Sequence, residues 1–187
     1  DAGIWRAEAF PSVEGSSAAP AVHVGGYLDN IRLDAFIAHL QPDKRGSAIA
    51  MTSDGHTHAT PSCAQSLTGL VCFDGDSDIA GASLRWHAAT LPIEVSVAGV
   101  MRRERGDLYS ANGDTRYSGE TRGAWLEAAW TIRPEWLVLF RTERLVAEHD
   151  LKGFGASLVA HDAGFLPEPG ATTRNALAVA WLPRKDT

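Results

Sequence analysis

Apolar and polar residues alternate with a period of two along most of this chain, and this alternation constrains the fold more than any other feature. In the segment 30–40, NIRLDAFIAHL, Ile31 and Leu33 share one side while Arg32 and Asp34 share the other. Successive side chains of a β-strand point to opposite faces, so the pattern predicts strands with one apolar face.

The alternation recurs along the chain and predicts about nine strands and no helix. We expect strands in 3–10, 21–29, 30–40, 79–88, 92–103, 123–132, 136–143, 154–162 and 174–182. Short turns at 90–92 and 133–135 alternate with longer polar connections at 11–20, 41–77, 103–118 and 162–173. The chain is expected to form a single domain over residues 1–187.

The segment 122–144, RGAWLEAAWTIRPEWLVLFRTER, contains three tryptophans and is interrupted by Pro134. Proline disrupts a helix interior, so we expect two strands joined by a turn at this proline. Leu126 and Phe140 belong to the apolar side of this hairpin. Trp125 falls on the charged side and does not fit the pattern.

The net charge of -6 and the absence of a basic patch exclude nucleic acid as an expected partner. No apolar run approaches the roughly 20 residues of a transmembrane helix, but a transmembrane β-strand needs only about 9–11. Composition therefore does not decide whether the apolar face packs into a protein core or contacts lipid.

Three features of the pattern favour lipid. Arginine and acidic residues lie in the middle of strands on one face, which suits a water-filled interior. Long loops alternate with tight turns, as at the two ends of an outer-membrane barrel. Tryptophans fall near strand ends, where an interfacial girdle is expected; these are Trp86, Trp130, Trp136 and Trp181.

We therefore expect an all-β fold, an antiparallel up-and-down transmembrane β-barrel of about 8–10 strands or a portion of a larger barrel. The alternative is a secreted soluble β-barrel or sandwich that binds a ligand, because a half-solvated antiparallel sheet also alternates.

The charged face supplies the candidate functional residues. Fixed charges in a lumen set ion preference, and five arginines against four acids predict a mild preference for anions. The predicted pore-lining residues are Arg32, Asp34, Arg85, Glu94, Arg102, Glu127, Arg141, Glu143 and Arg174. The alternative is that these side chains pair with one another and fill a non-conducting barrel.

Cys63 and Cys72 lie in the segment PSCAQSLTGLVCFDG. A disulfide between them would close a small loop and would imply an oxidising compartment such as a periplasm or the cell exterior. The alternative is two free thiols in a reducing cytosol. We predict the disulfide, because this polar segment offers no core in which to bury a thiol.

The segments RGAWLEAAWTIRPEWLVLFRTERL and TTRNALAVAWLPRKDT resemble the later strands of Gram-negative outer-membrane porins, in particular the phosphate-selective porin O/P-like group. The resemblance covers residues 120–187. It implies an outer-membrane location, contact with lipopolysaccharide and passive transport of small solutes or ions. Such porins have about sixteen strands or more, and outer-membrane barrels usually end on an aromatic residue, whereas this sequence ends LPRKDT. We expect either a small barrel with an unusual end or a portion of a larger one.

No nucleophile elbow, P-loop or dinucleotide fingerprint is present, so we expect no catalytic residues, with an outer-membrane hydrolase as the alternative. The pair His56 and His58 and the segment 74–78, DGDSD, are weak metal-binding patterns. We expect no metal site and no cofactor. A homo-oligomer and a structural role in a larger envelope complex are the further alternatives for its assembly.

Overall fold

The computed structural model of the chain describes residues 2–6, 18–42, 45–48, 70–165 and 170–181. This described part contains nine strands and one short helix. The strands are β1 (Ala2–Arg6), β2 (Ala18–Leu28), β3 (Ile31–Leu40), β4 (Arg45–Ala48), β5 (Leu70–His87), β6 (Ile93–Ser110), β7 (Gly113–Arg133), β8 (Trp136–Lys152) and β9 (Gly170–Trp181). The helix is α1 (Ala156–Asp162).

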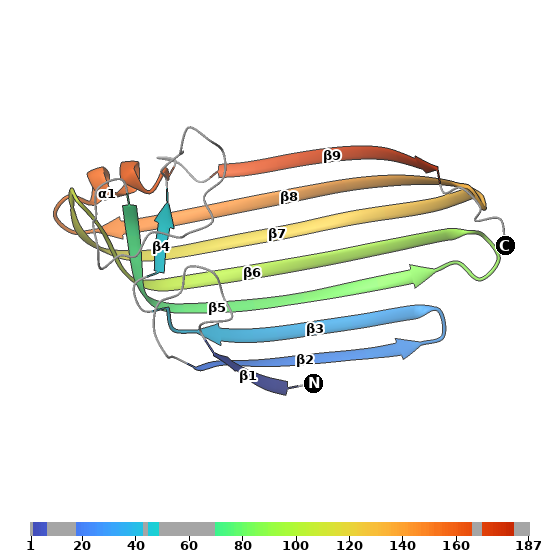
Figure 1. The fold of residues 1–187 in the computed structure, drawn as a ribbon, viewed down its shortest axis with the longest axis horizontal. Coiled ribbons are helices and arrows are strands. Elements are labelled where there is room, and N and C mark those ends of the chain that lie inside the picture. Colours follow the sequence, from blue (N-terminus) through green and yellow to red (C-terminus); the bar gives the residue numbers. More distant parts are fainter. Residues whose placement is uncertain (1, 7–17, 43–44, 49–69, 166–169, 182–187) are drawn as a thin grey trace.

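The strands form one antiparallel sheet in the order β1-β2-β3-β5-β6-β7-β8-β9, with β4 paired to the beginning of β5 (Figure 1). The prediction of an all-β, antiparallel, up-and-down fold is therefore confirmed. Among the described strands, β1 and β9 form the two edges and do not pair with each other. The tight turns after β2, β5 and β7 lie at one end of the sheet, and α1 lies at the other.

The expected strand at 154–162 is wrong, because this segment forms a turn followed by α1. Gly153 and Gly155 have φ values of 133° and 81°, in the region that favours glycine, and they end the extended backbone after β8. Val159 is the buried residue of the helix. A short alternating run does not separate a strand from a helix that buries one side chain per turn.

Two polar segments expected to be connections contain strand residues in the described part of the chain. Residues 103–118 form the end of β6, a tight turn and the start of β7. Residues 41–77 include β4 and the first part of β5. The strands β5 to β8 are therefore longer than the sequence pattern predicts.

The sheet has two faces, which differ in chemistry along its length. We call face A the face that carries Leu33, Leu84, Val97 and Leu126, which stand opposite one another on β3, β5, β6 and β7. Their exposed fractions lie between 37% and 50%. Face B is the opposite face of the same strands, and Arg32 and Arg85 are paired on it.

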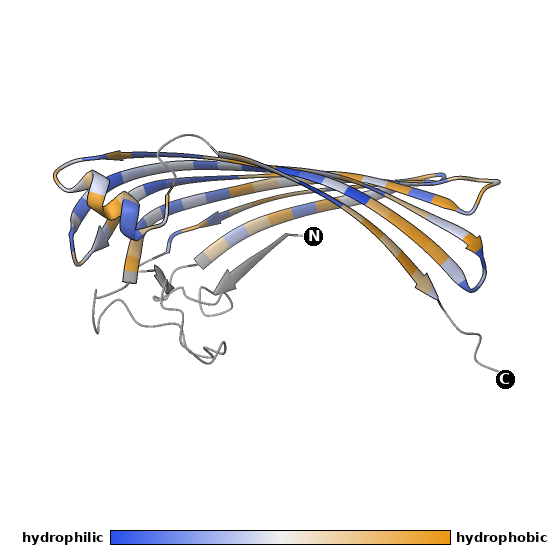
Figure 2. Cartoon of the chain, turned by 90° about the horizontal axis from the view of Figure 1, so that it is seen from above, coloured by the Kyte–Doolittle hydropathy of each residue, from blue (hydrophilic) through white to orange (hydrophobic). Residues whose placement is uncertain are grey.

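Face A carries an apolar belt over the half of the sheet nearer the tight turns, where Figure 2 shows apolar residues gathered. No described element covers this belt. Its large exposed members are Val22, Val24, Leu28, Leu33, Ile37, Leu84, Trp86, Val97, Leu126, Trp130, Trp136, Phe140, Leu177, Val179 and Trp181. The belt therefore extends from β2 to β9.

Toward the α1 end, the distribution is reversed, with apolar residues on face B and charged residues on face A. Face B there carries a small core of Val71, Phe73, Leu108 and Tyr117, against which Val159 of α1 packs. Face A at the same level carries charged residues such as Arg105 and Asp107. Each long strand thus has its apolar residues on face A in one half and on face B in the other.

The described helix α1 has seven residues. No helix in the described part of the chain is long and apolar enough to cross a membrane.

Candidate functional site

The strand register aligns polar side chains of face B into two neighbouring rows that run across the sheet, and we call these rows the polar ribbon. One row contains Tyr27, Arg32, Arg85, Ser96, Glu127 and Arg141. The other contains Asp34, Ser83, Trp125, Glu143 and Arg174. The ribbon lies at the level of the apolar belt but on the opposite face.

The register places all of the predicted pore-lining residues on face B. Most of them belong to the polar ribbon. Glu94 lies one row nearer the tight turns, opposite His87, and Arg102 lies nearer α1, opposite Ile79 and Thr121. Because the register settles only the face of the sheet, their role in a pore remains a prediction.

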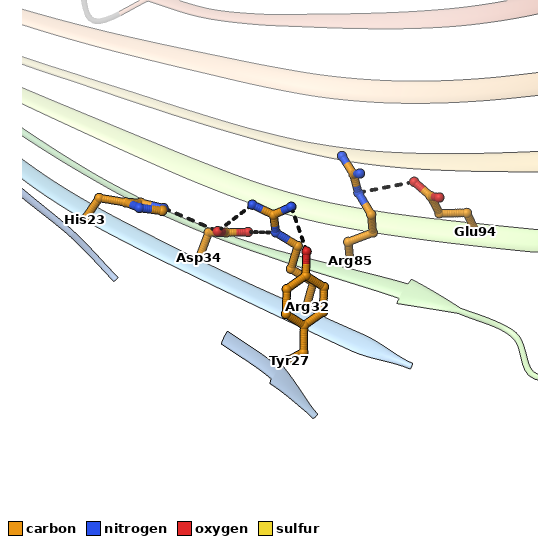
Figure 3. Close-up of polar contacts among 6 residues, drawn as sticks. All are labelled: His23, Tyr27, Arg32, Asp34, Arg85 and Glu94. Atoms are coloured by element: carbon orange, nitrogen blue, oxygen red, sulfur yellow. Dashed lines mark hydrogen bonds and ion pairs between the residues drawn. The ribbon is translucent and has the colours of Figure 1, made fainter. Parts of the chain in front are cut away.

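At the β2–β3 end of the ribbon, the Asp34 carboxylate accepts hydrogen bonds from Arg32 through Nε at 2.7 Å and Nη2 at 3.0 Å. His23 Nε2 lies 3.3 Å from the same carboxylate. Arg32 also donates to the Tyr27 hydroxyl at 3.1 Å, and its guanidinium lies 5.4 Å from the centre of the Tyr27 ring. Figure 3 shows Arg32 held between the carboxylate and the phenol.

In the centre of the ribbon, Arg85 on β5 lies 3.2 Å from Glu94 on β6 (Figure 3). His87 lies 3.2 Å from the same carboxylate. Ser96 stands between Arg85 and Glu127 in the row. The centre therefore combines one ion pair with a small hydroxyl.

At the β7–β9 end, the Glu143 carboxylate accepts one hydrogen bond from Nε of Arg141 at 2.9 Å and lies 2.6 Å from Nε of Arg174. Glu127 lies 3.7 Å from Arg141. The Arg141 guanidinium lies 5.4 Å from the centre of the Trp125 ring, a cation–π distance. Trp125, which did not fit the sequence pattern, therefore has an arginine partner on the polar face.

The ion pairs leave little basis for the predicted anion preference. Each arginine of the predicted set has a carboxylate within 4 Å. Sequence reasoning missed Glu104, which pairs with Arg102 at 2.7 Å and is only 5% exposed, because it falls in a segment taken as a loop. With Glu104 added, the predicted set contains five acids and five arginines.

The predicted interfacial tryptophans all lie on face A near the tight turns. Trp136 stands opposite Trp181 at the end of β8 and β9. The exposed fractions of Trp86, Trp130, Trp136 and Trp181 range from 38% to 61%. Their placement suits an interfacial girdle, and that role remains a prediction.

Cys72 lies in β5 on face A and is fully buried. Cys63 lies outside the described residues, so the disulfide remains a prediction. The pair His56 and His58 also lies outside them.

Residues 74–78, which resemble the start of a calcium-binding loop, do not form a loop, because they are extended within β5. A strand separates its carboxylates instead of wrapping them around one ion. Asp78 is held by His39, at 2.8 Å. Within the described part of the chain, no group of three metal-binding side chains is found.

No family model, curated protein or solved structure matches this chain. The resemblance of residues 120–187 to porins therefore remains a prediction.

A second feature of face B is the aromatic cluster that holds α1. The His149 ring stacks on Phe165 at 3.9 Å between centres, and Nδ1 of His149 lies 3.0 Å from the Tyr117 hydroxyl. Burial lowers the pKa of His149 below its ordinary value. Glu104 acts in the opposite direction on this pKa, and Arg102 lowers it further. No sequence pattern pointed to this cluster.

The end of α1 is fixed to the turn between β6 and β7. Asp162 accepts hydrogen bonds from the Ser110 hydroxyl at 2.6 Å and from the Asn112 side chain at 2.9 Å. These bonds lower the pKa of Asp162, with Ser110 contributing most. This link therefore persists at mildly acidic pH and is lost only when Asp162 itself becomes protonated.

Mild acid is expected to loosen α1 from the sheet. The docked state holds His149 with a lowered pKa, so it binds the proton less readily than the undocked state. Docking is then fully stable above the ordinary histidine pKa of about 6.5 and weakens as the pH falls below it. The rate of amide hydrogen exchange in residues 156–165, corrected for its intrinsic pH dependence, should rise several-fold when the pH is lowered from about 7.5 to about 5.

Two variants separate this effect from a general response to acid. His149→Phe keeps a ring beside Phe165 but does not titrate, so it should abolish the pH dependence. His161→Gln changes an exposed histidine of α1 and should leave the pH dependence intact. An unchanged pH response in His149→Phe would contradict the assignment.

Proposed function

We propose that this protein forms the wall, or part of the wall, of a Gram-negative outer-membrane β-barrel and acts as a passive pore for small solutes or ions. In this proposal, face A contacts lipid and face B lines a water-filled interior. The supporting observation is that an uncovered apolar belt and a charged ribbon occupy the same level on opposite faces of one sheet.

The extent of the belt supports lipid as its solvent. Soluble proteins rarely expose a contiguous apolar patch of more than a few hundred Å². Here the exposed apolar side chains continue across every long strand, from Val24 on β2 to Val179 on β9. In β6 the apolar positions run from Ile93 to Met101, comparable to the about 9–11 residues of a transmembrane strand.

The charged ribbon supports a hydrated interior. Burial of an unpaired charge in an apolar medium is costly, so ionic groups at membrane depth line cavities that hold water. The side chain of Arg85 is 53% exposed and that of Arg174 is 71% exposed, although both are ion-paired. These arginines therefore suit contact with water and solute better than a dry core.

A second candidate is a structural barrel of an envelope complex with a closed interior. The complete pairing of the arginines favours it, because paired charges fill narrow barrels. A soluble ligand-binding β-protein is the third. A protein that is monodisperse in plain buffer would favour the soluble candidate over the two membrane candidates. Single-channel conductance would distinguish the pore from the structural barrel.

The proposal is tested by reconstituting the full-length protein in planar lipid bilayers and recording single-channel currents. We expect stepwise conductance, and a requirement for detergent during purification. A monodisperse protein in plain buffer would contradict insertion in a membrane. A membrane-inserted protein without conductance would support the structural barrel instead.

A matched pair of variants tests which face lines the pore. Ser96 and Val97 are neighbours on β6 and point to opposite faces. Ser96→Trp should narrow the lumen and lower the single-channel conductance, whereas Val97→Trp should leave the conductance unchanged. The reverse result would show that the faces have been assigned the wrong way round.

A further inference from the structure

We propose that the polar ribbon is a binding track for uncharged, polyhydroxylated solutes, such as linear oligosaccharides, and not for inorganic anions. This inference rests on the proposed pore function, because it names the solute class that the same face would contact. Three properties of the ribbon support it: its charge balance, its hydrogen-bonding groups and its aromatic rings.

Charge balance disfavours an anion as the bound solute. The Arg32 guanidinium is engaged by the Asp34 carboxylate through two hydrogen bonds. Arg141 and Arg174 share the Glu143 carboxylate. An anion that approaches any of these arginines also meets a carboxylate within a few ångströms, so attraction and repulsion largely cancel.

The same pairing suits hydroxyl groups. A guanidinium offers only N–H donors, and a carboxylate offers only acceptors, so each ion pair presents both kinds of group side by side. A sugar hydroxyl donates and accepts at once and is therefore complementary to such a pair. Ser83 and Ser96 place further hydroxyls between the ion pairs of the two rows.

Two aromatic rings lie in the ribbon. Tyr27 is 76% exposed and lies beside Arg32, and Trp125 lies beside Arg141. An aromatic ring combines an apolar face with, in these two residue types, a polar handle, and it can pack against the C–H surface of a sugar ring. An inorganic anion has no apolar surface to use this contact.

The length of the ribbon suits a chain of sugar units. Tyr27 lies on β2 and Trp125 on β7, and four strand-to-strand steps separate them in the sheet. Neighbouring strands are about 4.8 Å apart, so the two strands that carry these rings are on the order of 19 Å apart across the sheet. A single small ion would occupy only a fraction of this track.

The test is a titration of the full-length protein in detergent with maltohexaose and, separately, with sodium tripolyphosphate, followed by calorimetry. We expect maltohexaose to bind with a Kd in the millimolar range and tripolyphosphate to bind much more weakly. The same sugar should interrupt single-channel currents. Tighter binding of tripolyphosphate, or no detectable binding of maltohexaose, would overturn the inference.

Variants tie the binding to the ribbon. Tyr27→Leu and Trp125→Leu should each weaken maltohexaose binding about two- to tenfold, because each removes one aromatic face. Tyr27 is largely exposed, so this variant is expected to fold normally. The matched control Trp130→Leu removes an indole from face A of the same strand and should leave the affinity unchanged.

The two proposals fail in different ways. A protein that conducts ions but does not bind maltohexaose disproves the sugar track and leaves the pore intact. A protein that binds maltohexaose in detergent and shows no conductance disproves the pore, while the ribbon remains a sugar site. Equal loss of binding in Trp130→Leu and Trp125→Leu would place the sugar outside the ribbon.

Discussion

Replacement of Val97 by arginine is expected to prevent assembly of the protein into membranes. Val97 lies on face A in the middle of the apolar run 93–101 of β6, between Leu84 and Leu126, and 48% of it is exposed. An arginine on the lipid face near the bilayer midplane costs about 2–4 kcal/mol. The equilibrium constant for folding into lipid vesicles, followed by gel mobility without heating across a urea series, should therefore fall about 30-fold or more.

Ser96→Arg is the matched control for this variant. Ser96 is the preceding residue of β6, on face B, next to Arg85 and Glu127. An arginine there would stand in the proposed hydrated interior and find a carboxylate, so folding should be nearly normal. Equal folding of both variants would remove the argument that face A contacts lipid and would favour the soluble alternative.

Glu143→Gln is expected to give the largest change in ion selectivity. The Glu143 carboxylate is within 3 Å of both Arg141 and Arg174, so its loss leaves two guanidinium groups poorly compensated. The native pore, with balanced charges, should show nearly equal anion and cation permeability. The variant should favour anions several-fold, as measured by the reversal potential in a potassium chloride gradient.

Asp150→Asn tests whether this change depends on the face. Asp150 pairs with Lys152 at 2.8 Å, and both lie on face A, so the variant removes the same charge outside the proposed lumen. Its reversal potential should equal that of the native protein. A similar shift in both variants would mean that selectivity reflects net charge and not the residues of face B.

The sequence predicted the half of the sheet that bears the apolar belt. In that half each strand alternates strongly, with Leu126 and Phe140 on one face and Glu127 and Arg141 on the other, and the register agrees with this phase. The turn at Pro134 also falls between β7 and β8 as expected. Strong contrast between two faces is what makes a strand recognisable.

The other half of the sheet was missed because the contrast there is weak and reversed. In β6, Arg103 and Arg105 lie on face A while Leu108 lies on face B, so the apolar side changes within one strand. Glu104, which is buried, lies in the part of β6 beyond the expected strand end. No local pattern reports such a reversal, since it depends on where α1 covers the sheet.

The candidate site divides in the same way. The arginines and acids of the ribbon were identified from alternation alone, but their pairing was not. The contact of Arg141 with Trp125, and that of Arg32 with Tyr27, join neighbouring strands. Such contacts require the register of the sheet, which depends on turns and long-range pairing.

The abrupt end of the apolar belt has a consequence for how deeply the protein would sit in a bilayer. Three arginines of face A mark this end of the belt. Arg103 follows Met101 on face A of β6, and Arg122 precedes Ala124 on face A of β7. Arg144 of β8 is paired with Ala124 of β7. A displacement of two residues along the strands, about 7 Å, would draw these guanidinium groups into hydrocarbon. Because the strands are hydrogen-bonded in fixed register, they would all shift together and the penalties would add. In the proposed setting the sheet therefore has one preferred depth, and a thinner or thicker bilayer would be met by tilt and local lipid deformation, not by sliding.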